Sequence, residues 1–190
     1  GIAPGDTVGA DLLVFRPGSS RRTTLARLEE FACQDDGERH AVTIRSATGG
    51  GDGVMLFHPE SGVLRQLDSG DARDKGPTWR DESSQLAVFR SDDDDTRDGE
   101  AFDLLVCEDP SEKQDDVHVL ASAGRAVFGV SIAVCEYGGF DFSPDGQTVA
   151  FGTPNGVYVV PLGGGTVRTL TTGMSTCCLR WGDDGYIYFS

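Results

Sequence analysis

The sequence has very few lysines and asparagines, and it lacks a long apolar run. Of its 190 residues, only two are lysine and one is asparagine. No apolar stretch approaches the roughly 18 residues that a membrane-spanning helix requires. No charged and apolar leader segment opens the chain. We therefore expect no membrane insertion by this segment.

Basic residues are scarce relative to acidic ones. The chain has 16 Lys and Arg against 31 Asp and Glu, which gives a formal net charge of -15. This charge repels phosphate backbones, so nucleic acid is excluded as a partner bound by charge neutralisation. Because 38% of the residues are apolar, the chain can still bury a core. Its length predicts one or two domains.

Cysteine spacing gives no sign of a metal site or a disulfide framework. The five cysteines are odd in number and contain no C-x-x-C pair. Cys177 and Cys178 are neighbours, and in a strand they would point to opposite faces, so they could not easily bind one metal together. We interpret the cysteines as small apolar core residues.

Sequence motifs of common enzymes are also missing. The chain has no G-x-S-x-G nucleophile elbow, no H-E-x-x-H and no Walker-type phosphate loop. The histidines His40, His58 and His118 are scattered, and residues 163–165 form a glycine run between two expected strands. We therefore predict no catalytic residues and no cofactor, and we interpret the chain as a non-enzyme.

A repeated turn pattern is the most informative feature that is present. In each copy an aromatic or apolar residue is followed three positions later by an acidic residue and then by a small turn residue. The copies are residues 33–37, 79–83, 142–146 and 181–185. A short apolar run follows each copy, as expected for a strand, a tight turn and a second strand. We name these two strands a and b.

A second pair of strands, c and d, alternates with the first pair. Strand c is expected at residues 12–15, 54–57, 104–106 and 157–160. Strand d is expected at residues 24–25, 63–67, 117–120 and 167–170. Along the chain the order is c-d, then a-b-c-d three times, then a-b.

This order predicts an all-β fold, a β-propeller of about four blade-equivalents. Four-stranded antiparallel units with apolar inner strands must stack on copies of themselves to bury both faces. In the clearest unit, residues 140–173, Asn155-Gly156 is a favoured pair for a two-residue hairpin turn. A β-sandwich is the alternative, because it also has short strands at regular spacing. Repetition of the same turn chemistry favours the propeller.

We expect residues 1–190 to form a single propeller domain or a fragment of one. Its expected parts are strands c-d at 1–30, blades at 31–70, 76–124 and 140–173, and strands a-b at 177–190. The two ends could combine into one blade and close a four-bladed ring. Alternatively, the chain is part of a larger ring.

The motif Phe142-Ser143-Pro144-Asp145-Gly146 and the strands after it resemble the WD-like repeat of TolB-type propellers. Similar repeats occur in the propellers of prolyl oligopeptidase-type peptidases and in the sensor domains of bacterial kinases. Elsewhere the match is weaker, since Glu82-Ser83-Ser84 replaces the Asp-Gly turn. The resemblance implies a propeller and an extracytoplasmic, for example periplasmic, location. It does not imply one function, because propellers serve many.

Two long insertions fall on one face of the expected propeller, the face of the b-c and d-a loops. The first is the acidic loop 91–100, and the second is the connection 124–142. Loops on a rigid scaffold commonly carry binding residues. Candidate contacts with a partner are Arg97, Arg125, Glu136 and Tyr137.

The acidic loop allows two interpretations. It is either a solvated loop or a calcium site, because hard cations prefer clustered carboxylates. The candidate calcium ligands are Asp92, Asp94 and Asp98. An EF-hand is disfavoured, because Leu105 stands where the bidentate glutamate belongs.

The sequence leads to one main functional hypothesis and two alternatives. The main hypothesis is a non-catalytic propeller module that binds a protein or peptide or serves as a scaffold. The first alternative is the substrate-gating propeller of a prolyl oligopeptidase-type serine peptidase whose hydrolase domain lies outside this chain. The second is the sensor propeller of a bacterial receptor kinase.

Overall fold

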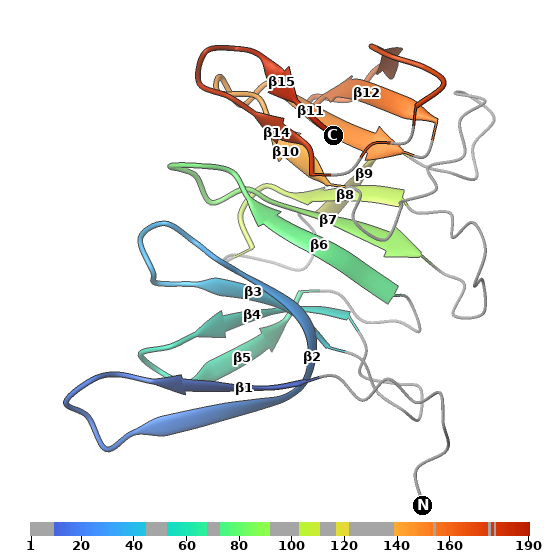
Figure 1. Ribbon diagram of the computed structural model, residues 1–190. Helices are drawn as coiled ribbons and strands as arrows, with labels where there is room; N and C mark the ends of the chain where they lie inside the picture. Colours follow the sequence, from blue (N-terminus) through green and yellow to red (C-terminus); the bar gives the residue numbers. More distant parts are fainter. Residues whose placement is uncertain are drawn as a thin grey trace, which may run out of the picture.

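The chain folds into a row of antiparallel β-sheets (Figure 1). The computed structural model describes residues 10–44, 53–67, 73–91, 103–110, 117–121, 139–153, 155–174, 176 and 178–190. Every regular element in these ranges is a β-strand. In the same ranges, no helix combines the length and the hydropathy needed to cross a bilayer.

The first sheet contains five strands in sequence order. They are β1 (Ala10–Phe15), β2 (Arg22–Cys33), β3 (His40–Ile44), β4 (Gly53–His58) and β5 (Val63–Gln66). The sequence analysis expected a separate strand at 24–25 and another ending near Cys33. This was wrong, because the structure joins them into the single strand β2. The first half of β2 pairs with β1 and the second half with β3, with an irregularity between Leu28 and Glu30.

Two four-stranded sheets follow, each with its strands in the order a-b-c-d. The second sheet contains β6 (Arg73–Trp79), β7 (Leu86–Ser91), β8 (Asp103–Cys107) and β9 (Val117–Ala121). The third contains β10 (Phe140–Phe142), β11 (Thr148–Thr153), β12 (Gly156–Pro161) and β13 (Arg168–Thr169). A final hairpin pairs β14 (Arg180–Trp181) with β15 (Ile187–Tyr188). The predicted all-β propeller architecture is confirmed.

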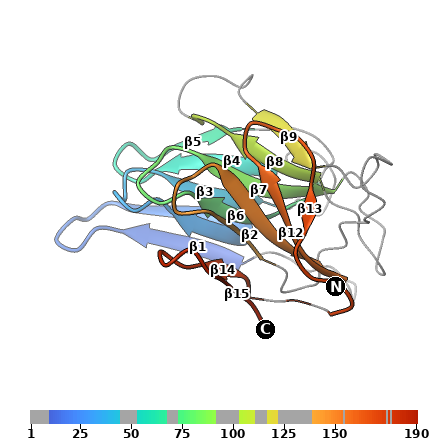
Figure 2. The same cartoon turned by 90° about the horizontal axis from the view of Figure 1, so that it is seen from above.

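The sheets overlap when the stack is seen from above (Figure 2). Apolar side chains fill the space between successive sheets. Ala41 and Val42 are adjacent in β3, point to opposite faces and are both fully buried. Ala41 packs towards the second sheet, whereas Val42 packs with Leu12 and Leu25 of the β1–β2 hairpin. Inner strands buried on both faces therefore read as continuous apolar runs, which explains the repeats seen in the sequence.

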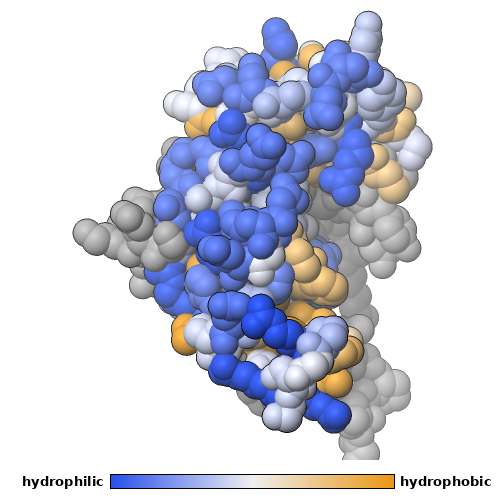
Figure 3. Space-filling view, turned by 90° about the vertical axis from the view of Figure 1, so that its left-hand side faces the viewer, coloured by the Kyte–Doolittle hydropathy of each residue, from blue (hydrophilic) through white to orange (hydrophobic). Residues whose placement is uncertain are grey.

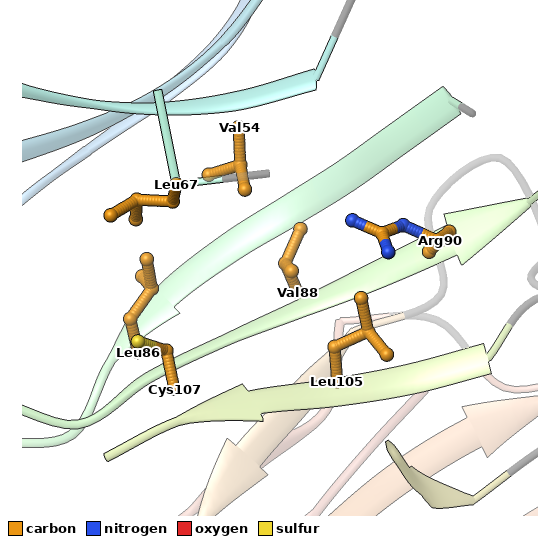
Figure 4. A pocket seen from close by; sticks show the side chains of 7 residues that line it. All are labelled: Val54, Leu67, Leu86, Val88, Arg90, Leu105 and Cys107. Atoms are coloured by element: carbon orange, nitrogen blue, oxygen red, sulfur yellow. The ribbon is translucent and has the colours of Figure 1, made fainter. Parts of the chain in front are cut away.

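A small gap remains between the first and second sheets (Figure 4). Its walls are mainly aliphatic, with Val54 and Leu67 on one side and Val88 and Leu105 on the other. The cavity measures about 10 Å³, room for roughly one water molecule. At its rim, Arg90 Nε lies 3.2 Å from the buried Asp74 carboxylate. This gap is a packing feature and is too small to hold an organic ligand.

The two ends of the stack do not meet. Within the described strands, β1 pairs with β2 and β15 pairs with β14, and the two hairpins lie at opposite ends of the stack (Figure 1). The sequence analysis considered that strands c-d and a-b of one chain could form one closing blade. The structure instead has an open row of blades with an incomplete unit at each end.

Candidate binding face

All site residues predicted from the sequence lie outside the described residues. This applies to Arg97, Arg125, Glu136 and Tyr137 as partner contacts. It applies equally to the candidate calcium ligands Asp92, Asp94 and Asp98. These assignments stay predictions, and the site must be built from the opposite face of the propeller, the face of the a-b and c-d turns.

The described turns gather on one side of the stack, at the left of Figure 1. Figure 3 views the molecule from this side and shows a surface dominated by hydrophilic residues. The turn at 143–147 shows how the repeat motif works. The Ser143 hydroxyl donates to Asp145 Oδ1 at 2.6 Å, and the Gln147 amide donates to the same oxygen at 3.0 Å. Both bonds lower the pKa of Asp145, and the bond from the Ser143 hydroxyl is the larger cause. The ionised carboxylate of Asp145 therefore stabilises the turn.

An arginine from the first sheet binds the turns of the second. Arg39 Nε donates to Gln34 Oε1 at 2.8 Å within its own turn, and Nη2 donates to the Ser84 hydroxyl at 3.2 Å. Its Nη1 lies 3.4 Å from Asp109 Oδ1, and its guanidinium sits 5.8 Å from the centre of the Trp79 ring. These contacts orient one turn against the next, because the planar guanidinium donates in fixed directions.

A second arginine makes the equivalent contact one sheet further on. Arg80 Nη1 donates to Gln85 Oε1 at 2.8 Å, and Nη2 reaches the Asp145 backbone carbonyl at 3.4 Å. Its guanidinium lies directly over Gly146, where φ is +62° and a Cβ atom would collide with the arginine. The turn face is therefore built as a chain of arginine contacts running from sheet to sheet.

Carboxylates play the matching role along the first strands of successive sheets. A Glu30 oxygen of β2 accepts a hydrogen bond from the Gly76 amide of β6. In the same way, Asp141 Oδ2 of β10 accepts from the Trp181 amide of β14 at 2.9 Å. Strand a forms one edge of its blade, so its amides have no ladder partner on that side, and these carboxylates satisfy them.

Four carboxylates from four successive units lie at or beside this end of the a strands, and three of them act on the fourth. We name Asp35, Asp81, Asp141 and Asp183 the axial carboxylates. The pKa of Asp81 is raised, first by desolvation and then by the charges of the other three. Arg180 acts in the opposite direction, and its Nη1 lies 3.8 Å from Asp141. The arrangement concentrates negative potential beside the a-b turns.

Part of this cluster was visible in the sequence. Asp35, Asp81 and Asp183 each stand two residues after the first residue of the repeated turn pattern, at Cys33, Trp79 and Trp181. The sequence analysis used the acidic residue three positions after the first and did not single out these three aspartates. Equivalent positions in stacked repeats come together in space, so the shared position was the available signal. Asp141 stands at a different position of the repeat and gave no such signal.

The described histidines and cysteines do not converge on a site. His40 begins β3 and His58 ends β4, while His118 lies in β9 of the next sheet. Burial lowers the pKa of His40, which favours its neutral form. Within the described ranges, no three His, Cys, Asp or Glu side chains are grouped so that they could hold a metal ion. The chemistry of the described turn face is thus electrostatic and hydrogen-bonding.

Comparison with known proteins supports the fold and leaves the family open. No family model matches the chain, and the search of curated proteins gave no match. Among solved structures, TolB from Acinetobacter baumannii is 16% identical to this chain, with a TM-score of 0.60. The match covers 94% of this chain and 42% of the TolB chain. The β-propeller domain of the trilobed protease from Pyrococcus furiosus is 9% identical to this chain, with a TM-score of 0.58. The match covers 88% of this chain and 51% of the protease propeller chain.

A peptidase also matches. Acylaminoacyl peptidase from Pyrococcus horikoshii is 10% identical with a TM-score of 0.56, over 88% of this chain and 29% of its own. The chain thus spans about half or less of the length of these three structures. The fold is that of the TolB and peptidase propellers, as the sequence resemblance predicted.

Proposed function

We propose that this chain is a non-catalytic propeller module that binds a cationic peptide or a cationic segment of a protein at the axial carboxylates. The observation that carries the proposal is that Asp35, Asp141 and Asp183, which come from three other units, lie near enough for their charges to help raise the pKa of Asp81. A cation bound beside the axial carboxylates reduces the repulsion between their negative charges, and this reduction favours binding.

The surroundings of the cluster favour a peptide over a small cation. Arg39 and Arg80 hold the neighbouring turns in place through side-chain contacts, so the face is pre-organised. Its surface is hydrophilic (Figure 3), which suits hydrogen bonding to an extended chain. The net charge of -15 would steer a basic partner towards the module over a long range at low salt. One structural neighbour, with a TM-score of 0.52, is described in complex with a coiled coil.

Fluorescence anisotropy with labelled ten-residue peptides tests the proposal. We expect an arginine- and lysine-rich peptide to bind with an affinity that falls as salt rises, and a glutamate-rich peptide of equal length not to bind. The double variant Asp81→Asn/Asp183→Asn is expected to weaken binding about tenfold, because contacts between charged groups are worth roughly 1–2 kcal/mol here.

The control removes the same two charges elsewhere. Asp11 lies on β1 and Glu60 in the β4–β5 turn, and both are exposed. Asp11→Asn/Glu60→Gln should therefore leave binding within about twofold of the wild-type chain. Equal losses in the two double variants would show that net charge alone attracts the peptide and would refute the axial site.

A second function is supported by the peptidase neighbours. Prolyl endopeptidase and acylaminoacyl peptidase structures contain propellers that superimpose on this chain. On this reading the chain is the gating propeller of a serine peptidase, and its open reading frame continues into an α/β-hydrolase domain with a G-x-S-x-G motif. A reading frame with a kinase domain and a membrane span would instead indicate a receptor sensor. A signal peptide would support the periplasmic location.

A further inference from the structure

One hairpin turn of the third sheet contains the only asparagine of the chain. Thr153 at the end of β11 pairs with Gly156 at the start of β12, and Asn155 directly precedes that glycine. The turn joins strands b and c, so it lies at the end of the sheet opposite the a-b turn at 143–147. It is therefore separate from the axial carboxylates.

The fold requires glycine at position 156. The φ angle of Gly156 is +149°, and a Cβ atom there would lie 2.1 Å from the Thr171 carbonyl oxygen. A main-chain oxygen cannot move aside as the end of a flexible side chain can, so a larger residue is excluded at this position. Gly156 consequently has no side chain that would shield its own main-chain nitrogen from a reacting group.

The side chain of Asn155 is exposed and is not held by hydrogen bonds. The main-chain amide of Asn155 donates to Thr153 Oγ1 at 3.0 Å, and its carbonyl accepts from the Gly173 amide at 2.9 Å. Both bonds use the main chain, and among the described residues the side-chain amide has no hydrogen-bond partner. Rotation of the side chain can therefore bring its amide carbon, Cγ, towards the nitrogen of the next residue.

A second turn of the same sheet shows what protection of such a site involves. Asp145 also precedes a glycine, Gly146, but the Ser143 hydroxyl and the Gln147 amide both donate to its Oδ1 atom. These bonds lower the pKa of Asp145, so its side chain is an ionised carboxylate, which a nitrogen nucleophile attacks poorly. The side chain of Asn155 is a neutral amide and lacks both kinds of protection.

We propose that Asn155 is a site of spontaneous deamidation, with water as the only co-reactant. The main-chain nitrogen of Gly156 forms a bond to Cγ of Asn155 and closes a cyclic imide. The bond from Cγ to Nδ2 breaks, and the leaving amino group takes up the proton that the attacking nitrogen releases, so ammonia departs. Water then opens the imide at either of its carbonyl groups and gives aspartate or isoaspartate, without oxidation or reduction.

The two products are expected to differ in stability. Aspartate keeps the length of the main chain and adds one negative charge at an exposed position. Isoaspartate carries the main chain through the former side chain, so the carbonyl of Asn155 that accepts from Gly173 becomes a carboxylate outside the main chain. The longer turn also moves the Gly156 carbonyl, which accepts from the buried Thr153 hydroxyl at 3.3 Å. A buried hydroxyl that loses its acceptor destabilises the fold.

Incubation of the folded chain, followed by peptide mass spectrometry, tests the proposal. We expect a gain of about 1 Da at Asn155. The rate should rise about tenfold per pH unit, because the deprotonated fraction of the attacking amide does so. A reaction that required global unfolding would be about a thousandfold or more slower in the folded chain than in urea. We expect the folded chain to be at most about tenfold slower, because the turn is exposed.

The variant Asn155→Gln is the matched control, because glutamine keeps the side-chain amide but would have to close a larger ring. The mass gain at this position should become at least about tenfold slower. Asn155→Asp represents one product and should keep the wild-type midpoint of urea unfolding, whereas the purified isoaspartyl form should have a lower midpoint.

Two results would overturn the proposal. The first is a folded chain that reacts about a thousandfold more slowly than the urea-unfolded chain at the same pH, which would show that the fold protects Asn155. The second is a mass gain at the wild-type rate in Asn155→Gln, which would place the reaction elsewhere in the chain. Isoaspartate found at Asn155 with an isoaspartyl methyltransferase, and not at Asp145, would support the contrast between the two turns.

Discussion

The complete sheets in the middle of the chain and the incomplete hairpins at its ends are built from the same repeat, yet they bury very different fractions of their apolar side chains. Phe89 of the second sheet and Phe151 of the third are each 1% exposed. By contrast, Phe15 of the N-terminal hairpin is 63% exposed. A repeat of this kind is stabilised by its two neighbours as much as by its own strands.

The polar contacts show the same contrast. In the middle of the stack, Arg39 bridges two sheets and its side chain is only 13% exposed. At the N-terminal end, Arg16 pairs with Glu60 at 2.8 Å, with side chains 76% and 75% exposed. An exposed ion pair contributes little, whereas a mostly buried arginine with several acceptors fixes the sheets relative to each other.

The largest expected effect tests the apolar side of this contrast. Phe151→Ala removes a ring that packs between the second and third sheets and stacks on Tyr158 at 5.7 Å. We expect a loss of about 3–5 kcal/mol in the free energy of unfolding. Phe15→Ala, also measured by urea unfolding, is expected to cost less than about 0.5 kcal/mol. Similar losses in the two variants would mean that the end hairpin is as tightly packed as the middle.

A smaller effect is expected for the polar contacts. Arg39→Ala removes the bonds to Gln34, Ser84 and Asp109 and should cost about 1.5–3 kcal/mol. Arg16→Ala is the control and should cost less than about 1 kcal/mol. Because the Arg39 contacts include a bond to Asp109, high salt should reduce only part of that difference. If Arg39→Ala were no more destabilising than Arg16→Ala, the arginine contacts would have no role in joining the sheets.

Much of the fold could be predicted from local sequence because each blade uses the same local turn chemistry. Asn155-Gly156 and Pro144-Asp145-Gly146 identify the third sheet, and β11 and β12 appear where the apolar runs predicted them. Strand β2 was divided in the prediction although residues 22–33 contain no glycine or proline to end a strand. At β2 the prediction followed the period of the repeat and disregarded the absence of a residue that would end the strand.

The candidate site was harder to predict because it depends on contacts between repeats. Asp35, Asp81 and Asp183 share a position in the repeat, but the effect of the other two charges on the pKa of Asp81 depends on how neighbouring blades pack. That packing involves whole sheets and leaves no local sequence signal. The insertions were prominent in the sequence for the opposite reason, because their length breaks the repeat.

The smallest expected effect concerns Asp81 and Asp145, two aspartates of the turn face whose ionised forms change the free energy of unfolding in opposite directions. The pKa of Asp81 is raised above its ordinary value of 3.8, by desolvation and by the neighbouring carboxylates, so ionised Asp81 destabilises the folded chain. Asp81→Asn should therefore raise the free energy of unfolding at pH 7 by less than about 1 kcal/mol, since solvent screens the charges. The gain should shrink as pH falls through the raised pKa towards 3.8.

Asp145→Asn is expected to act in the opposite direction. Its pKa is lowered by the Ser143 hydroxyl and the Gln147 amide, so the ionised form stabilises the turn above pH 3.8 and this contribution is lost as pH falls through the lowered pKa. The variant should thus be less stable than the wild type at pH 7, and the difference should vanish in acid. Urea unfolding from pH 7 down to about pH 2 measures both. If Asp81→Asn also destabilised the chain at pH 7, Asp81 would serve the turn as Asp145 does, and the axial carboxylates would hold no repulsion for a cationic partner to relieve.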